Sequence, residues 1–123
     1  MLEAHAAALA VAGAFASMGI AGLLRPGWLA SLVGIATTTP LLRNEVRAVY
    51  GGFGCAVALA LAWSTTPAAG ALGPGMRLAT AVALLGMVGG RLLSFAVERA
   101  GRLPWAFALG ELGAAALLLD AWN

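Results

Sequence analysis

The chain has 123 residues, of which 62% are hydrophobic and only 10% are charged. An ordinary soluble domain carries about 25% charged residues, so this composition excludes a water-soluble domain. The formal net charge of +2 is too small to attract a phosphate backbone, which excludes a nucleic-acid-binding protein. We therefore expect a single integral membrane domain over residues 1–123, with the lipid bilayer as its partner.

The first apolar segment runs from about residue 4 to residue 24. It is long enough to cross a bilayer core of about 30 Å. The segment lacks a basic region before it and is too long for the core of a signal peptide, so we expect it to be retained. Residues 28–36 are also apolar but too short to span the bilayer, and they predict a short helix at the membrane surface.

The second span is expected over about residues 41–63. Thr39 and Pro40 predict its start, because threonine is a favoured N-cap residue and proline suits the first turn of a helix. After this span, residues 64–75 are rich in proline, glycine and serine, which predicts a loop.

Two further spans are expected over about residues 77–99 and 104–121. The sequence thus predicts an all-α fold, a membrane-embedded four-helix up-down bundle with a short interfacial helix between helices 1 and 2. Small residues recur at helical spacing and predict close contact between the helix backbones. They are Gly13 and Ser17, then Gly51, Gly52 and Cys55, then Gly86 and Gly90, and finally Gly110 and Ala114.

The placement of the arginines predicts the orientation of the bundle. Arg25 and Arg43 flank the first connection between spans, and Arg99 and Arg102 flank the third. Only Arg77 belongs to the second connection. Because arginines gather on the cytoplasmic side, connections one and three are expected in the cytoplasm and both termini outside it.

Three ionisable or polar residues are expected at one depth in the membrane. Helical rise places Tyr50, Arg91 and Glu111 about 10–15 Å inside the cytoplasmic boundary. Each ionisable side chain near the centre of a span costs about 2.5–3.5 kcal/mol. Ionisable residues occur inside spans where they form ion pairs or serve a function. This level of the bundle is therefore the candidate functional site.

The residue types at this level indicate acid–base chemistry on a polar group. Carboxylates can donate or accept a proton, and arginines can hold an anionic or carbonyl oxygen through their forked donors. The candidate catalytic residues are Glu111 and Glu45, and the candidate substrate-binding residues are Arg47, Tyr50, Arg91 and Ser94. No metal site and no cofactor are expected, because the chain has one cysteine and one histidine.

Three functions are compatible with this pattern. The first is a membrane-embedded site for a lipophilic small molecule, with the chemistry of an isomerase, cyclase or hydrolase of lipids or isoprenoids. The second is a structural or accessory membrane protein whose buried ion pairs only fix the packing of helices. The third is an ion-coupled transporter, which would be a homodimer.

Three sequence elements resemble a known family. They are the segment from Asn44 to Gly52, with the pattern NExRAxYGG, the segment from Gly90 to Ser94, with the pattern GRxxS, and Glu111. Together they are similar to a family of small four-span bacterial membrane proteins known only as a domain of unknown function. The resemblance implies location in a bacterial inner (plasma) membrane. It supplies no activity.

Overall fold

A computed structural model describes residues 1–98 and 105–120 of the chain. Every regular element in this part of the chain is helical, which confirms the predicted all-α fold. In chain order the elements are α1 (Leu2–Leu24), α2 (Pro26–Ser31), α3 (Pro40–Val46), η1 (Arg47–Gly52), α4 (Phe53–Trp63), η2 (Pro67–Ala69), α5 (Leu72–Glu98) and α6 (Trp105–Asp120). The predicted connection around Arg99 and Arg102, which carries half of the orientation argument, lies outside the described residues.

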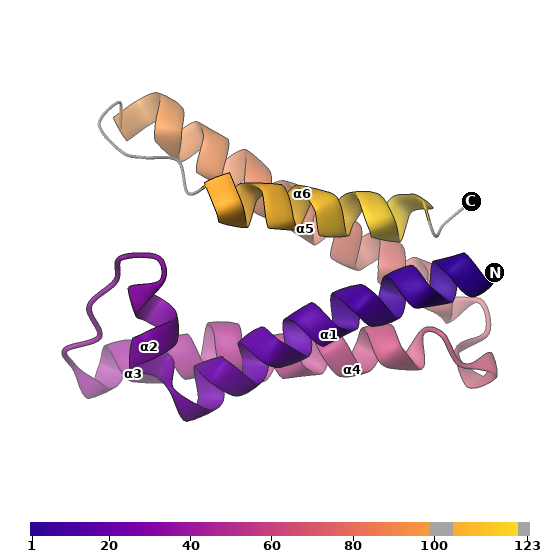
Figure 1. The fold of residues 1–123 in the computed structure, drawn as a ribbon, viewed down its shortest axis with the longest axis horizontal. Coiled ribbons are helices and arrows are strands. Elements are labelled where there is room, and N and C mark those ends of the chain that lie inside the picture. Colours follow the sequence, from indigo (N-terminus) through magenta and orange to yellow (C-terminus); the bar gives the residue numbers. More distant parts are fainter. Residues whose placement is uncertain (99–104, 121–123) are drawn as a thin grey trace.

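The long helices associate in two pairs (Figure 1). In the first pair, α1 lies along the continuous helix formed by α3, η1 and α4. In the second pair, α5 lies along α6. The ribbons of the two pairs come together near the chain termini and separate toward α2 and α3.

Three of the helices are long and apolar enough to cross a membrane: Leu2–Leu24, Pro40–Trp63 and Leu72–Glu98. They correspond to the first three predicted spans. In the described part of the chain α6 has 16 residues, fewer than the roughly 20 that a bilayer core requires. A fourth crossing therefore stays a prediction.

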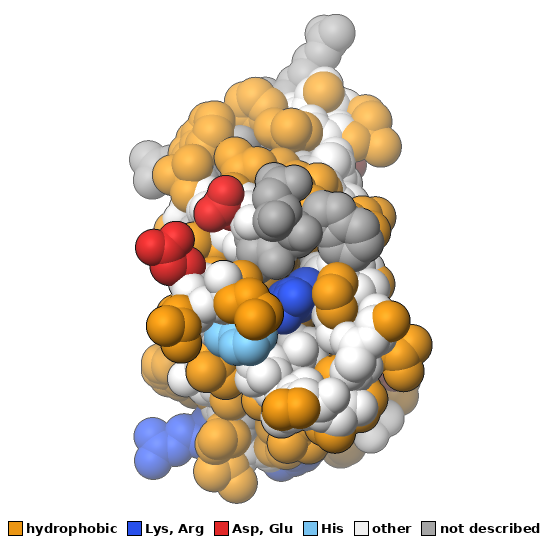
Figure 2. All heavy atoms as spheres, turned by 90° about the vertical axis from the view of Figure 1, so that its right-hand side faces the viewer, with side chains coloured by type: hydrophobic (Ala, Val, Ile, Leu, Met, Phe, Trp, Pro, Cys, Tyr) orange, Lys and Arg blue, Asp and Glu red, His pale blue; other side chains and the backbone are white. Residues whose placement is uncertain are grey.

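The surface of the helices is suited to lipid rather than water. Large apolar side chains are exposed on every long helix; they include Ile20, Leu59, Leu93 and Leu109. At the end of the molecule shown in Figure 2, apolar side chains cover much of the surface and charged ones are few. A soluble monomer rarely exposes apolar area of this extent.

The second long helix begins as its sequence predicts. The Thr39 Oγ1 atom accepts a hydrogen bond of 3.2 Å from the Leu42 backbone N–H, and Pro40 occupies the first turn. Before it, α2 is a short helix, but it covers Pro26–Ser31 and not the expected residues 28–36. The position of α2 at a membrane surface stays a prediction.

The third long helix begins earlier than expected, at Leu72 rather than near residue 77. The predicted loop over residues 64–75 is correspondingly shorter and contains the 3-10 turn η2. Proline is tolerated in the first turn of a helix because its missing N–H would have no partner there. Pro74 therefore does not prevent the helix from starting at Leu72. A Cβ atom on Gly73 would lie 2.5 Å from the Ser64 carbonyl oxygen, so this helix start packs closely on the end of α4.

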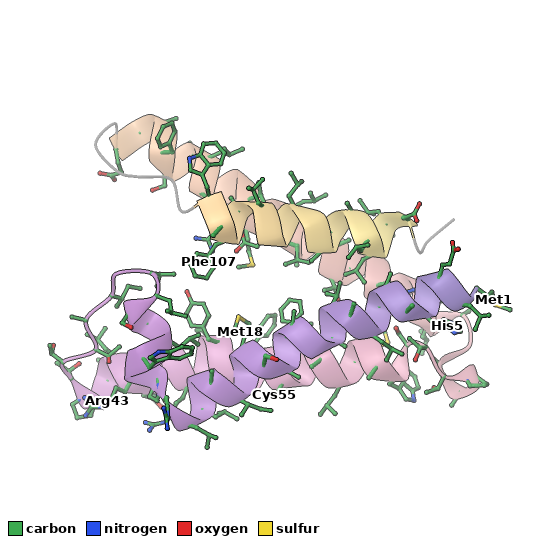
Figure 3. The ribbon with its side chains drawn as sticks, in the orientation of Figure 1. Met1, His5, Met18, Arg43, Cys55 and Phe107 are labelled. Atoms are coloured by element: carbon green, nitrogen blue, oxygen red, sulfur yellow. The ribbon has the colours of Figure 1, made fainter. Side chains whose placement is uncertain are left out.

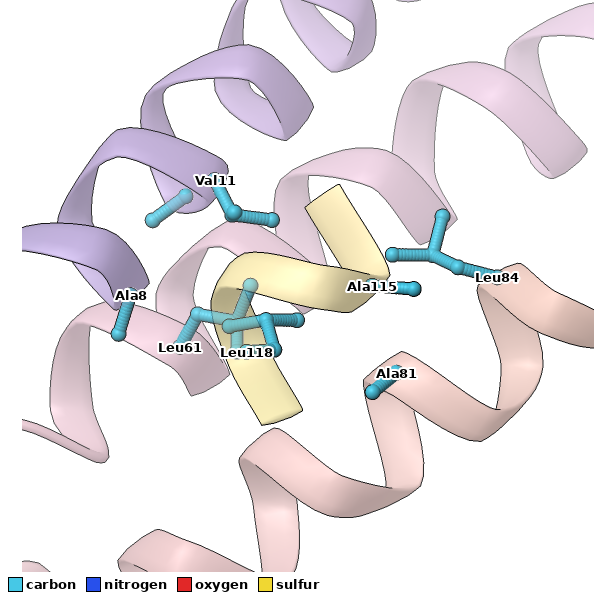
Figure 4. Packing of buried hydrophobic residues seen from close by; sticks show 8 residues of the cluster. Ala8, Val11, Leu61, Ala81, Leu84, Ala115 and Leu118 are labelled. Carbon is cyan, nitrogen blue, oxygen red and sulfur yellow. The ribbon is translucent and has the colours of Figure 1, made fainter. Parts of the chain in front are cut away.

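A small-residue core joins the two pairs near the chain termini (Figure 4). Both pairs contribute to it, with Leu61 and Leu118 as its largest fully buried side chains. The buried members are Ala8, Val11, Ala12, Leu61, Ala81, Leu84, Ala115 and Leu118. Because half of these are alanines, the helices approach closely here. In lipid no hydrophobic effect drives helices together, so van der Waals contact between close backbones has to stabilise their association.

Close backbone contact within the first pair confirms the prediction for Gly51 and Cys55, which both meet glycines of α1. A Cβ atom on Gly19 would lie 2.6 Å from the Cys55 backbone nitrogen, so α1 and α4 touch at this point. The predicted contacts of Gly13, Gly86, Gly90 and Gly110 are wrong, because a Cβ atom at each would meet no described atom within 4 Å. Helical spacing alone cannot show which face of a helix meets a neighbour.

Candidate functional site

The strongest polar contact in the described chain joins the second pair of helices. The Arg91 guanidinium of α5 donates two hydrogen bonds to the Glu111 carboxylate of α6, from Nε to Oε2 at 2.8 Å and from Nη2 to Oε1 at 2.6 Å. The side chains are 22% and 10% exposed. A planar guanidinium matches a carboxylate in this two-point geometry, which fixes both side chains relative to each other.

Phe107 adds an aromatic contact that the sequence analysis missed. Its ring centroid lies 5.6 Å from the Arg91 Cζ atom, within the range of a cation–π interaction. Phe107 precedes Glu111 by four positions on α6, so the two side chains share a helix face. This i, i+4 spacing was the signal in the sequence that could have identified Phe107.

A pocket of about 70 Å³ opens beside this ion pair, between the two helix pairs. Met18 of α1 and Phe107 of α6 both point into the space between the pairs (Figure 3). Further apolar walls come from α2 and the residues after it, namely Leu29, Ala30, Val33 and Ile35, and from Met87 of α5. The pocket is therefore an apolar cavity with the Arg91–Glu111 pair in its wall.

Tyr50 is the third polar residue that lines the pocket. It belongs to η1, a π-helical turn inside the second long helix. π-helical turns inside α-helices are frequent at functional sites because the extra residue turns side chains to a new direction. The Tyr50 side chain is half-buried, and no hydrogen bond joins its hydroxyl to a described residue. The structure thus brings together Tyr50, Arg91 and Glu111.

Arg47 lies elsewhere, although the sequence analysis expects it beside Arg91. Its Nε atom donates a hydrogen bond of 3.1 Å to the Leu23 carbonyl oxygen, in the last turn of α1. The last carbonyls of a helix have no partner within the helix, and a cation near them is favoured by the helix dipole. This carbonyl, which the sequence could not place near Arg47, takes the side chain away from the pocket.

The other two predicted site residues also lie outside the pocket. Glu45 and Ser94 are exposed, and neither lines the cavity beside the ion pair. Arg43, on the opposite side of the same helix, donates a hydrogen bond of 3.1 Å to the Thr37 carbonyl oxygen and does not line the pocket either. Ser94 lies one turn beyond Arg91, toward the end where the pairs separate.

Arg77 is a buried charge that the sequence analysis assigned to a connection. The structure places it in the second turn of α5, only 6% exposed. Its Nη1 atom lies 3.5 Å from the Ser64 carbonyl oxygen, and its Nε atom has no partner among the described residues. Arg77 thus reaches back to the end of α4, as Arg47 does to the end of α1.

The pocket offers hydrogen-bond chemistry but no metal-binding cluster. Within residues 1–98 and 105–120, no group of three or more His, Cys, Asp or Glu side chains could hold a metal ion. Cys55, the only cysteine, is half-buried against α1. The available groups are a carboxylate that can accept, a guanidinium that can donate and a phenol that can do both.

The chain matches a protein family of unknown function. A family model described as "Domain of unknown function (DUF4345)" matches residues 4–121 of the chain. No curated protein and no solved structure matches the chain significantly. The site must therefore be interpreted from its own geometry.

Proposed function

Since the chain belongs to the DUF4345 family, which is defined by sequence and not by an activity, we propose a function from the geometry of the pocket. The protein is a multi-pass membrane protein that binds a lipophilic small molecule and holds the polar head of that molecule at the Arg91–Glu111 pair. The single observation that carries this proposal is an ion pair in the wall of an apolar pocket between two helix pairs.

The location of the ion pair supports binding. Two charges within membrane helices are costly, and pairing them offsets only part of this cost. A pair needed only for packing could lie sealed between α5 and α6. Here both residues line a cavity whose walls also include residues of the first helix pair, of α2 and of the segment after α2. A polar head in this cavity would hydrogen-bond to both groups.

The size of the pocket limits what it can hold. Sites for drug-sized ligands typically enclose about 300–1,000 Å³, whereas this cavity measures about 70 Å³. Only a head group fits inside. The apolar remainder of the ligand would lie against the exposed apolar surface of the helices, in the place of lipid.

Glu111 is the proposed acid–base group if the bound molecule is also a substrate. It lines the pocket, whereas Glu45 is exposed and does not. With Arg91 holding an oxygen of the head group and Tyr50 supplying a hydroxyl, Glu111 could move a proton in an isomerase, cyclase or hydrolase reaction. A lipid or isoprenoid is the matching substrate class.

A purely structural ion pair is the second candidate function. The observation that favours it is the two-point geometry, in which each partner already satisfies part of the other's hydrogen-bonding capacity. The third possibility, ion-coupled transport by a homodimer, has no comparable support in the contacts of the described residues.

The membrane arrangement completes the proposal. The chain forms a four-helix up-down bundle in a bacterial inner membrane, with α6 as the fourth span and α2 at the membrane surface. Arg25, Arg43 and Arg47 all belong to the end of the molecule where α2 and α3 lie. This end faces the cytoplasm because arginine favours that side, so both termini lie outside.

Analysis of co-purified lipids tests the binding function. We would purify the wild-type protein, the double variant Arg91→Met/Glu111→Leu and the matched control Glu45→Gln in mild detergent, and identify bound molecules by mass spectrometry of organic extracts. We expect wild type and the control to retain one class of lipophilic molecule that the double variant loses. Equal retention by all three, or no molecule in wild type, would favour the structural role.

A further inference from the structure

The charge and hydrogen-bonding groups of the pocket narrow the class of molecule that it can take. We infer that the ligand is an amphiphile with a small, uncharged head that carries a hydroxyl or carbonyl group, and that the pocket discriminates against anionic lipids and fatty acids. This inference rests on the proposed binding function and adds the chemical class of the ligand.

The wall of the pocket carries no net charge. Among the described residues that line the cavity, only Arg91 and Glu111 are charged, and they compensate each other. Arg47, which would have added a second positive charge, donates to the Leu23 carbonyl instead. A bound anion would therefore leave one uncompensated negative charge in an apolar cavity, and such a charge is strongly disfavoured.

Displacement of the carboxylate does not remove this difficulty. An anionic head could take the place of Glu111 on the Arg91 guanidinium only if the Glu111 carboxylate were left without its partner. Removing one partner from a buried ion pair is strongly destabilising, because the remaining charge stays buried. Glu111 is only 10% exposed and so cannot turn readily to water in its present position.

The unused donors and acceptors supply the second argument. A guanidinium has five N–H groups, and Arg91 uses two of them on Glu111. The others donate to no described residue. A carboxylate also keeps free lone pairs in this arrangement, and the Tyr50 hydroxyl has no described partner. A hydroxyl head can satisfy donors and acceptors together, and a carbonyl head can satisfy the donors.

The volume supplies the third argument. A cavity of about 70 Å³ accommodates a hydroxyl or carbonyl group with a few attached atoms, since one water molecule needs about 10–15 Å³ on the same measure. A sugar head, or a phosphate that carries a further substituent, has more atoms than this volume accommodates. Size and charge thus point to the same class of molecule.

Comparison of the retention of three amphiphiles that share one tail length tests the inference. Delipidated wild-type protein in detergent would be incubated at about pH 9 with hexadecan-1-ol, hexadecanoic acid or hexadecylamine, under which conditions the acid is ionised and most of the amine is protonated. The retained molecule would be quantified after gel filtration. We expect the alcohol to be retained at least about tenfold more than either charged molecule, because only the alcohol leaves the pocket neutral.

The variant Glu111→Gln sharpens the test. It leaves Arg91 as an unpaired positive charge, so retention should shift toward hexadecanoic acid, whereas the exposed control Glu45→Gln should keep the preference of wild type. Should Glu111→Gln fail to fold, the comparison in wild type alone decides.

Each outcome has a distinct meaning. Preference of the wild-type protein for the acid or the amine overturns the inference and leaves the binding function intact. An unchanged preference for the alcohol in folded Glu111→Gln also overturns it, because the ion pair would then not set the selectivity. Absence of retention for all three probes, together with no co-purified molecule, overturns the binding function itself.

Discussion

Gly22 of α1 lies so close to Gly51 of η1 that a Cβ atom on Gly22 would be 2.7 Å from the Gly51 backbone nitrogen. Both residues are buried. Tyr50 precedes Gly51 in the same π-helical turn, so this backbone contact holds the tyrosine wall of the pocket against α1. The contact between two glycines is thus linked directly to the geometry of the site.

Substitution of Gly22 by alanine should destabilise the protein. Alanine favours a helix over glycine by about 1 kcal/mol, but overpacking against a backbone costs about 1–3 kcal/mol, so the clash with Gly51 should dominate. The control Gly13→Ala lies in the same helix with nothing within 4 Å of its Cβ atom. Thermal unfolding in detergent should show a lower Tm for Gly22→Ala and an equal or higher Tm for Gly13→Ala. An equal rise of Tm in the two variants would contradict the close contact between Gly22 and Gly51.

The ion pair should show strong coupling in a double-mutant cycle. Arg91→Met and Glu111→Leu, as single variants, each leave one charge without its partner, and each should lower the free energy of unfolding by about 3–5 kcal/mol, the range found for broken buried pairs. The double variant Arg91→Met/Glu111→Leu has no charge to compensate and should unfold near wild type. Denaturation of the purified variants in mixed micelles measures these free energies of unfolding. Additive losses from the two positions would argue against a direct pair.

Arg47 should affect stability but not binding. Its side chain caps the last turn of α1 through the Leu23 carbonyl, so Arg47→Gln should cost about 1 kcal/mol, the typical value of a hydrogen bond. Retention of the co-purified molecule should not change, because Arg47 does not line the pocket. If Arg47→Gln lost the ligand but kept the Tm of wild type, Arg47 would be a ligand-binding residue, as the sequence analysis expects.

Filling the pocket should abolish binding. Val33 lines the cavity, and Val33→Phe would place a ring in a space of about 70 Å³. Val82, 58% exposed on α5, provides the control Val82→Phe with the same change of side chain. Extracted lipid per mole of protein should fall in the first variant only, with both proteins folded. A fall of equal size in Val82→Phe would show that the effect is not specific to the pocket.

The proposed orientation can be tested with reporters fused to either terminus. Alkaline phosphatase is active outside the cytoplasm and green fluorescent protein is fluorescent inside it. With both termini outside, phosphatase fusions should be active and fluorescent fusions dark, because the arginine-rich connections stay in the cytoplasm. The reverse pattern would show that these arginines do not set the topology.

Much of the fold follows from the sequence because lipid imposes simple rules on composition and length. The three helices suited to crossing a membrane match predicted spans, and Thr39 and Pro40 begin the second of them as expected. The start of α5 at Leu72 was missed, because proline and glycine can either form a loop or occupy the first turn of a helix. Only the packing of Gly73 on Ser64 resolves that choice.

The sequence by itself predicted a membrane environment, the helical class and a common level along the helices for Tyr50, Arg91 and Glu111, because hydropathy, span length and helical rise are local properties. The tertiary structure decided which of the polar residues meet. The Arg91 guanidinium of α5 donates to the Glu111 carboxylate of α6, whereas Arg47 donates to the Leu23 carbonyl oxygen at the end of α1. Such partners depend on how each helix is rotated and what lies beside it. Helix packing sets the rotation and the neighbours of each helix. It thereby keeps Arg47 out of the pocket, so that the charges of Arg91 and Glu111 cancel there.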